Sequence, residues 1–101
     1  MDEYTISWSL LFQKLYDRLD PSEQQWIRKI ENKLKLNPSG NILRYSWFRE
    51  KKYLDKRLYY LVHEHNKKIL FIAFGSKKEQ ERTIQDVVDH MEEWLETLNE
   101  L

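Results

Sequence analysis

Residues 47–62 read WFREKKYLDKRLYYLV, and this stretch decides the fold. Side chains alternate between the two faces of a β-strand. One face of the segment 57–63 is wholly apolar or aromatic and is expected to look into the core: Leu58, Tyr60 and Val62. The opposite face begins with Arg57, carries Tyr59, and is expected to look toward a surface.

The same stretch is strongly basic. Residues 44–57 contain six cations and two anions, a local balance of +4. The cations are Arg44, Arg49, Lys51, Lys52, Lys56 and Arg57. A turn is expected over residues 50–56, which would bring Lys51 and Lys52 close to the exposed face of the following strand. The sequence therefore predicts a basic, aromatic-edged β-hairpin supported by the rest of the chain.

Length and composition predict one folded domain spanning residues 1–101, because 41% hydrophobic and 14% aromatic residues supply enough apolar surface for a core. The absence of cysteine favours a reducing compartment. No apolar run reaches the roughly 20 residues that span a bilayer, and the start MDEYTISW lacks the features of a signal peptide. We expect a cytoplasmic protein without a membrane segment.

The formal net charge is zero, but the charges are segregated along the chain. Residues 79–100 contain eight acids and one base, a balance of −7, in contrast to the basic middle of the chain. A neutral total argues against strong non-specific binding of nucleic acid. This asymmetry is more informative about the protein's partners than the total charge is.

The first 40 residues predict a short strand and two helices. Residues 5–8 have β-type character, and Ser9 can cap a helix that runs to Asp20. Asp20, Pro21 and Glu23 form a capping-box pattern for the second helix, which residues 37–40 (NPSG) end. The short link between the two helices predicts an antiparallel helical hairpin.

The remaining residues predict three strands and a long helix. Residues 42–49 alternate as a strand with Leu43, Tyr45 and Trp47 on one face, and residues 68–75 are apolar on both faces, as in the middle of a covered sheet. Ser76 and Glu79 then predict a capping box at the start of a helix that continues to the end of the chain. The order β-α-α-β-β-β-α indicates an α+β domain.

These features together resemble the RelE/ParE superfamily of toxins. The resemblance rests on the element order, on the residues 34–38 (LKLNP) with Gly40 following, and on the strand 57–60 (RLYY). It covers nearly the whole chain. The fold that it implies has an N-terminal strand and helical hairpin, then an antiparallel β-meander and a long C-terminal helix.

The resemblance implies the toxin of a type II toxin–antitoxin pair, with an antitoxin protein as partner. RelE-type members cut messenger RNA in the ribosomal A site and inhibit translation without a metal or another cofactor. No carboxylate or cysteine stands at a spacing that would complete a set of metal ligands with His63 and His65, so no metal site is expected. The alternatives are a ParE-like toxin that poisons DNA gyrase without cutting nucleic acid, or a degenerate member that only binds protein.

The site that the resemblance implies is a cluster of cations. The candidate catalytic residues are Arg57, Lys52, Lys51 and Lys78, and the candidate RNA-binding residues are Arg49, Lys56, Tyr59 and Lys77, with Tyr59 stacking on a base. Fixed cations suit RNA cleavage through the 2′-oxygen, because negative charge develops on the phosphorus. Where the family has an aromatic residue acting as base, this chain has Ile84.

The end of the C-terminal helix is a candidate partner surface. A helix over residues 77–99 would be about 34 Å long, whereas a typical strand spans about 17–20 Å. The apolar stripe nevertheless continues beyond the expected cover: Met91, Trp94, Leu95 and Leu98. An antitoxin helix, or the same helix of a second copy in a homodimer, would cover this stripe. Alternatively, the helix bends back over the helix of Trp26 and buries the stripe internally.

Overall fold

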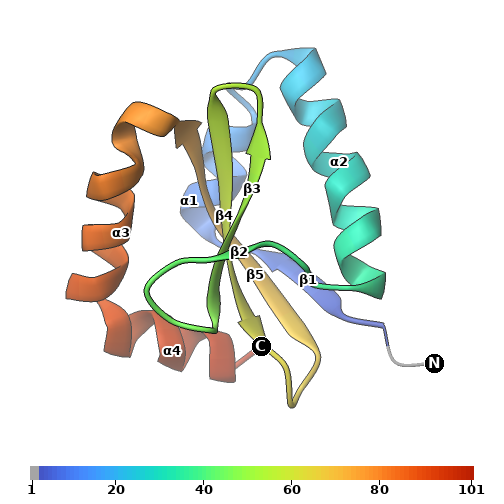
Figure 1. Cartoon of the computed structure of the whole chain (residues 1–101). Helices are drawn as coiled ribbons and strands as arrows, with labels where there is room; N and C mark the ends of the chain where they lie inside the picture. The colour runs from blue at the N-terminus through green and yellow to red at the C-terminus, as the bar shows by residue number, and fades with distance from the viewer. Residues whose placement is uncertain (1–2) are drawn as a thin grey trace.

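The computed structural model describes residues 3–101 and shows an α+β fold, as expected (Figure 1). Met1 and Asp2, at the start of the stretch judged to lack a signal peptide, lie outside this range. The elements in chain order are β1 (Thr5–Trp8), α1 (Leu10–Tyr16), α2 (Pro21–Leu36), β2 (Asn41–Ile42), β3 (Phe48–Tyr53), β4 (Lys56–His63), β5 (Lys68–Ser76), the 3₁₀ turn η1 (Lys77–Glu79), α3 (Gln80–Asp89) and α4 (Met91–Asn99). Within residues 3–101, no helix combines the length and the apolar character that crossing a bilayer requires.

The five strands form one mixed sheet in the order β1-β5-β4-β3-β2. The strands β2 to β5 are antiparallel neighbours, and β1 adds in parallel to β5. Helices α1 and α2 cover one face of this sheet, while α3 and α4 cover the other (Figure 1). The expected meander and the interior position of β5 are therefore confirmed.

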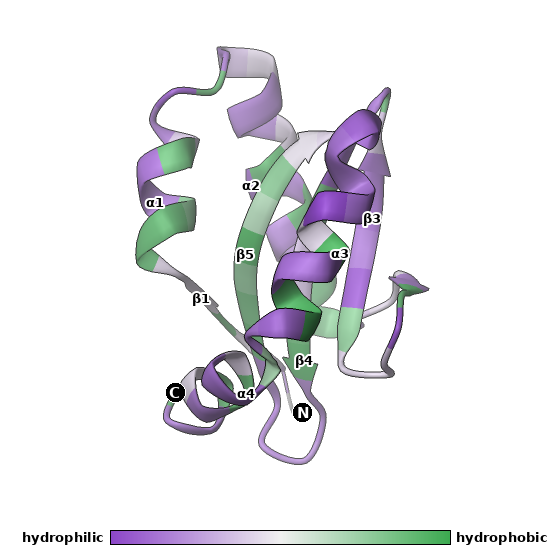
Figure 2. Cartoon of the chain, turned by 90° about the vertical axis from the view of Figure 1, so that its left-hand side faces the viewer, coloured by the Kyte–Doolittle hydropathy of each residue, from purple (hydrophilic) through white to green (hydrophobic). Residues whose placement is uncertain are grey.

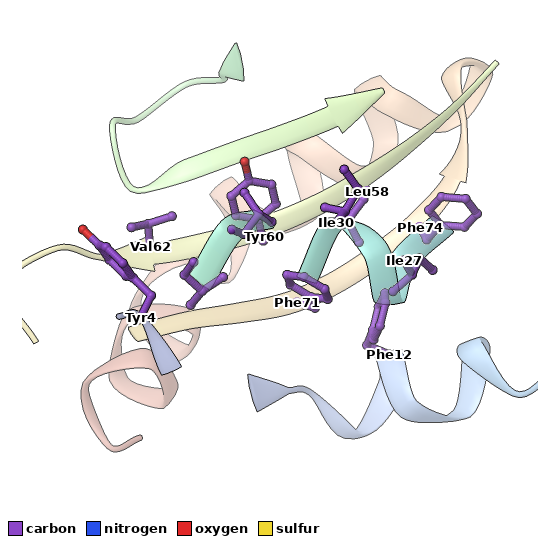
Figure 3. Packing of buried hydrophobic residues seen from close by; sticks show 11 residues of the cluster. Tyr4, Phe12, Ile27, Ile30, Leu58, Tyr60, Val62, Phe71 and Phe74 are labelled. Atoms are coloured by element: carbon purple, nitrogen blue, oxygen red, sulfur yellow. The ribbon is translucent and has the colours of Figure 1, made fainter. Parts of the chain in front are cut away.

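The first core lies between the sheet and the helical hairpin (Figure 3). The capping box predicted from Asp20 and Glu23 is present: Asp20 accepts from the Glu23 N–H at 2.9 Å, and Glu23 accepts from the Asp20 N–H at 3.1 Å. These bonds fix where α2 begins and hence which helix face meets the sheet. The fully or largely buried members of this core include Phe12, Ile27, Ile30, Leu34, Leu58, Tyr60, Val62 and Phe71.

The second core lies on the opposite face of the sheet and corrects one prediction. Tyr59 and Leu61, on the strand face that was expected to be exposed, are 1% and 0% exposed. They pack with Phe48, Leu70, Ile72, Ile84, Val87 and Leu98. Figure 2 shows the largely apolar ribbon of β5 beside α3, whose own ribbon is mostly hydrophilic. The second helical layer, α3 and α4, buries this face of the sheet. The alternation of side chains along β4 therefore did not show which face is exposed to water.

The strand predicted over residues 42–49 is wrong. Only Asn41 and Ile42 form β2; residues 43–47 are a loop, and β3 begins at Phe48. The alternating apolar side chains of this loop pack against the second core, and the rings of Tyr45 and Trp47 stack with centroids 4.9 Å apart. Loop side chains that pack on a core can therefore imitate a strand pattern.

The turn predicted over residues 50–56 is also wrong in extent. β3 continues to Tyr53, so Lys51 and Lys52 lie on a strand and their side chains point to opposite faces. The turn itself consists of Leu54 and Asp55, with Leu54 at φ 56°. This left-handed conformation closes the hairpin without a glycine.

The helix boundaries differ from the expectation at three places. The first helix ends at Tyr16, several residues before Asp20. Ser76 precedes the 3₁₀ turn η1 without a side-chain capping bond, so the capping box predicted with Glu79 is absent. The C-terminal helical segment is long, as expected, but divides at His90, whose φ of −117° and ψ of 29° end α3.

Candidate anion-binding site

The β3–β4 turn brings cations from three segments to one end of the sheet. Lys52 is the register partner of Arg57, and Arg57 is the partner of Gly75 on β5. Paired residues share a face, so Lys52 and Arg57 lie on the α3 side of the sheet. Lys77 and Lys78 follow β5 directly, and a hollow of about 640 Å³ is lined by Asp55, Ser76, Lys77 and Lys78.

Arg57 is buried rather than exposed as predicted, at 6% relative exposure. Its Nη1 donates to the carbonyl oxygens of Lys56 at 2.9 Å and Leu54 at 3.4 Å. Its Nε lies 3.9 Å from Oε1 of Glu50 and has no hydrogen-bond partner within residues 3–101. The guanidinium is thus held beneath the turn by backbone acceptors and one carboxylate.

Glu50 is a buried member of the site that the sequence reasoning missed. Its side chain faces Arg57 because the two residues lie on the same sheet face, and only 5% of Glu50 is exposed. Oε1 accepts a hydrogen bond from Nε2 of Gln80 at 2.6 Å, and Oε2 lies 3.5 Å from Nδ2 of Asn41. Gln80 is 30 positions further along the chain, so only the folded topology reveals this contact.

Three lysines supply the accessible positive charge of the site, beside the exposed Asp55. Lys52, Lys77 and Lys78 are exposed, and no ion pair or hydrogen bond within residues 3–101 engages their amino groups. The main-chain N–H of Lys77 donates to the carbonyl oxygen of Asp55 at 2.8 Å and ties η1 to the hairpin turn. Exposed ammonium groups around a fixed guanidinium are suited to binding phosphate oxygens.

Arg49 and Lys51 do not join this group, although the sequence grouped them with it. They project to the α2 side of the sheet, where Arg49 donates to the carbonyl oxygens of Pro38 at 2.7 Å and Ser46 at 2.9 Å. Arg49 also pairs with Glu64 at 2.6 Å. Nζ of Lys51 donates to Oγ of Ser39 at 3.0 Å. Both side chains bind the segment between α2 and β2, and Arg49 also binds the loop before β3 through Ser46.

Lys56 is likewise on the α2 side. Its Nζ lies 2.5 Å from Oε2 of Glu23, in the first turn of α2. The Glu23 carboxylate raises the pKa of Lys56 above its usual value. The structure therefore separates the predicted cations into a site on the α3 side (Lys52, Arg57, Lys77, Lys78) and a set of structural anchors on the α2 side (Arg49, Lys51, Lys56).

Tyr59 contradicts the expectation that its ring stacks on a base. At 1% exposure no ring face is open, and the ring packs near Phe48 with centroids 6.3 Å apart. Its hydroxyl is buried and has no hydrogen-bond partner within residues 3–101. Burial raises the pKa of Tyr59 to about 12. Ile84, at the position where the sequence resemblance implies an aromatic base, is also part of the second core at 8% exposure.

The predicted partner stripe is partly internal. Leu98 is 2% exposed and belongs to the second core, so its place on an exposed stripe is wrong. The break at His90 turns α4 across the sheet, on the face opposite the helix of Trp26 (Figure 1). Met91, Trp94 and Leu95 are partly buried. A hollow of about 530 Å³ beside α4 is lined in part by Trp47, Val62, His63, Leu95 and Leu98.

Comparison with known proteins connects this arrangement to a family of folds. No family model matches the sequence, and no curated protein gives a significant match. A mutant of the E. coli toxin RelE in the free state superposes with a TM-score of 0.69 at 15% identity, over 78% of this chain and 88% of RelE.

Two toxin–antitoxin complexes give similar results. The E. coli RelBE complex matches with a TM-score of 0.65 at 15% identity, over 72% of this chain and 95% of the other. The RelBE2 complex of Mycobacterium tuberculosis matches with a TM-score of 0.65 at 15% identity, over 74% and 99%. The chain therefore has a RelE-like toxin fold, as the sequence resemblance implies.

Proposed function

We propose that this protein is the toxin of a toxin–antitoxin pair and that it cleaves messenger RNA on the ribosome. The observation that carries the proposal is the cluster of three exposed lysines, unpaired among the residues that the structure describes, around the buried guanidinium of Arg57. The RelE-like fold supports it, since the matched structures are RelE toxins and their complexes with antitoxins. A ribosomal target places the protein in the cytoplasm.

The proposed reaction needs charge stabilisation and one proton transfer. The 2′-oxygen of the RNA forms a bond to phosphorus, the bond to the 5′-oxygen breaks, and the proton of the 2′-hydroxyl is transferred so that the 5′-oxygen leaves as a hydroxyl. Lys77 and Lys78 hold the neighbouring phosphates, while Lys52 and Arg57 face the scissile one. Cations fixed before the reaction stabilise the charge that develops on the phosphate oxygens. The proposed reaction uses no metal ion.

The cognate antitoxin is the proposed protein partner. The hollow beside α4 offers apolar walls, and the exposed face of α4 carries Glu92, Glu93, Glu96 and, directly after it, Glu100. A basic segment with an apolar anchor would complement both features. Met91, Trp94 and Leu95 remain proposed contacts at the edge of this surface.

The test is controlled expression in a bacterial host, followed by mapping of RNA 5′ ends on isolated ribosomes. We expect growth arrest, inhibited protein synthesis, and new 5′-hydroxyl ends at ribosome-bound positions. Co-expression of the antitoxin should prevent all three effects. Growth arrest with intact ribosome-bound transcripts would overturn the nuclease proposal.

A second candidate is a ParE-like toxin that acts through protein contacts on DNA gyrase. The burial of Ile84 and Tyr59 favours it, because neither position offers an accessible aromatic base to the site. This candidate predicts an induced DNA-damage response and stabilised gyrase–DNA complexes without RNA cleavage. The same expression experiment therefore separates the two functions.

A further inference from the structure

Two polar contacts join the β3–β4 hairpin to the segment that follows β5. The N–H of Lys77 donates to the carbonyl oxygen of Asp55 at 2.8 Å. Nε2 of Gln80 donates to Oε1 of Glu50 at 2.6 Å, in a partly buried setting. Together they fix the start of α3 against the hairpin and hence fix the two sides of the hollow described above.

The packing at Gly75 shows how close this approach is. Gly75 lies opposite Arg57 in the register of β4 and β5. A Cβ atom at Gly75 would lie 3.1 Å from Oε2 of Glu79 in η1, closer than ordinary van der Waals contact. The turn η1 therefore packs directly over the end of β5, next to the guanidinium.

Glu50 is an unexpected group in a site proposed to bind phosphate. Its carboxylate is 5% exposed, and its Oε1 lies 3.9 Å from Nε of Arg57. A negative charge near a bound phosphate repels it, and the repulsion is strong where water is excluded. Considered as a charge alone, Glu50 should therefore weaken phosphate binding.

We infer that Glu50 and Gln80 are positioning residues, which form a latch between the hairpin and the start of α3. Oε1 of Glu50 accepts the hydrogen bond of Gln80 and lies 3.9 Å from Nε of Arg57, so that Arg57 and Lys52 face one phosphate while the lysines of η1 are held beside its neighbours. Side chains fixed by such supporting contacts lose less entropy when the ligand binds. This inference rests on the proposed function, since it assumes that the cations bind RNA phosphates.

Charge and position predict opposite effects of removing Glu50. If Glu50 acted only through its charge, Glu50→Leu would tighten RNA binding, because a repulsive charge is lost. If Glu50 positions Arg57 and Gln80, Glu50→Leu weakens binding in spite of the lost repulsion. Gln80→Leu changes no charge and removes only the hydrogen bond of the latch. The pair of variants therefore separates the two roles.

The probe is a single-stranded 2′-O-methyl RNA oligomer, which cannot be cleaved through its 2′-oxygen. Its affinity is measured by fluorescence anisotropy at low salt, at a temperature where thermal melts show each variant folded. We expect Gln80→Leu to bind roughly three- to tenfold more weakly, the range for one lost hydrogen bond. The double variant Glu50→Leu/Gln80→Leu should bind no more weakly than Glu50→Leu, since both changes break one contact.

Gln85→Leu is the matched control. Nε2 of Gln85 donates to Oδ1 of Asp89 at 2.7 Å on the exposed face of the same helix. Gln85→Leu removes the same kind of hydrogen bond at a position away from the site. This variant should bind RNA with wild-type affinity. A merely structural role of Gln80 would instead lower the melting temperature and leave the affinity of the folded protein unchanged.

The results that overturn the latch are specific. Wild-type affinity in Gln80→Leu, or tighter binding in Glu50→Leu, would show that Glu50 does not position the site. If Glu50→Leu fails to fold, Gln80→Leu and its control decide the question alone. A wild-type protein that does not bind the probe, or binds it without salt dependence, overturns the proposed function and the latch with it.

Discussion

Nζ of Lys56 lies 2.5 Å from Oε2 of Glu23, and this ion pair connects the first residue of β4 to the first turn of α2. Glu23 has a second task, because it accepts the Asp20 N–H in the capping box. One buried carboxylate thus joins the start of the helix to the edge of the basic hairpin. Lys56, predicted to bind RNA, is instead placed to hold the two layers together.

The pair predicts a pH dependence of stability. Because Glu23 raises the pKa of Lys56 above 10.5, the folded state retains this proton more strongly than the unfolded state. The contribution is fully present below the unfolded pKa and is lost as the pH rises through the folded one. We expect Lys56→Met to lose about 1 kcal/mol at pH 7 and the difference from wild type to disappear as the pH rises through the folded-state pKa of Lys56.

The measurement is urea unfolding of both proteins at a series of pH values. At each pH, the free energy of unfolding of one protein is subtracted from that of the other, which cancels the effect of titrating groups that both proteins share. Lys29→Met is the control, since Lys29 is exposed on α2 and forms no ion pair within residues 3–101. An Lys56→Met effect that persists unchanged at high pH would show that the pair is not its cause.

Two adjacent tyrosines should respond differently to loss of the hydroxyl. The Tyr60 hydroxyl donates to the carbonyl oxygen of Ser39, whereas the Tyr59 hydroxyl is buried without a partner within residues 3–101. We expect Tyr60→Phe to cost about 1 kcal/mol and Tyr59→Phe to be neutral or stabilising. RNA affinity should not change in Tyr59→Phe, because this ring is inside the core.

Tyr59→Phe should also differ from the wild type in the pH at which alkali unfolds it. Burial raises the pKa of Tyr59 to about 12, so its phenol remains protonated in the folded state while unfolded tyrosine ionises near pH 10. The stability that this group contributes is present below pH 10 and is lost as the pH rises toward 12. Tyr59→Phe should therefore unfold at a higher pH, as followed by tyrosine absorbance and circular dichroism. Unfolding at an unchanged pH would contradict the burial of this phenol.

Some parts of the fold could be predicted because their signals are local. The capping box of Asp20 and Glu23 lies within four residues, and the apolar run of β5 carries its own evidence of burial on both faces. The bounds of β3 were missed because its residues 48–53 (FREKKY) are mostly charged. Their side chains gain partners from distant segments, such as Ser39 for Lys51 and Gln80 for Glu50.

The candidate site was predictable only in outline. Local charge indicated the hairpin, but the side of the sheet on which each cation lies depends on where β3 begins, which sets the alternation. The surroundings of Arg57 depend on Glu50, which accepts a hydrogen bond from Gln80 of α3, more than 20 positions away from Arg57. No glycine or proline marks the break at His90, so the turn of α4 across the sheet had no sequence signal.

The lysines of the site should be required for function but not for stability. Lys52 and Lys78 are exposed and unpaired within residues 3–101, so Lys52→Ala/Lys78→Ala should leave the free energy of unfolding within about 0.5 kcal/mol of wild type. Growth inhibition should be lost. Each lysine that contacts a phosphate of single-stranded RNA adds about 0.7 to the slope of log affinity against log salt, so the slope should fall by about 1.4.

The matched control is Lys14→Ala/Lys33→Ala, which removes two exposed cations from the helical hairpin on the other side of the sheet. It lowers the net charge equally and should leave toxicity and the salt slope nearly unchanged. Equal losses in both double variants would indicate that net charge, not the β3–β4 site, governs RNA binding. Toxicity that survives in Lys52→Ala/Lys78→Ala would exclude the site.

The apolar positions of α4 should separate into core and surface. Leu98 is 2% exposed within the second core, so Leu98→Ala should destabilise the protein by about 2–5 kcal/mol even when it is dilute and monomeric. Leu11→Ala is the control, since Leu11 is 67% exposed on α1 and its truncation should cost little stability.

Trp94→Ser/Leu95→Ser removes two partly buried side chains at the proposed antitoxin surface. We expect this variant to remain folded, with some loss of stability, and to lose antitoxin binding or self-association in light scattering. Retained binding in Trp94→Ser/Leu95→Ser, or a stable Leu98→Ala monomer, would show that the division between core and surface is drawn in the wrong place.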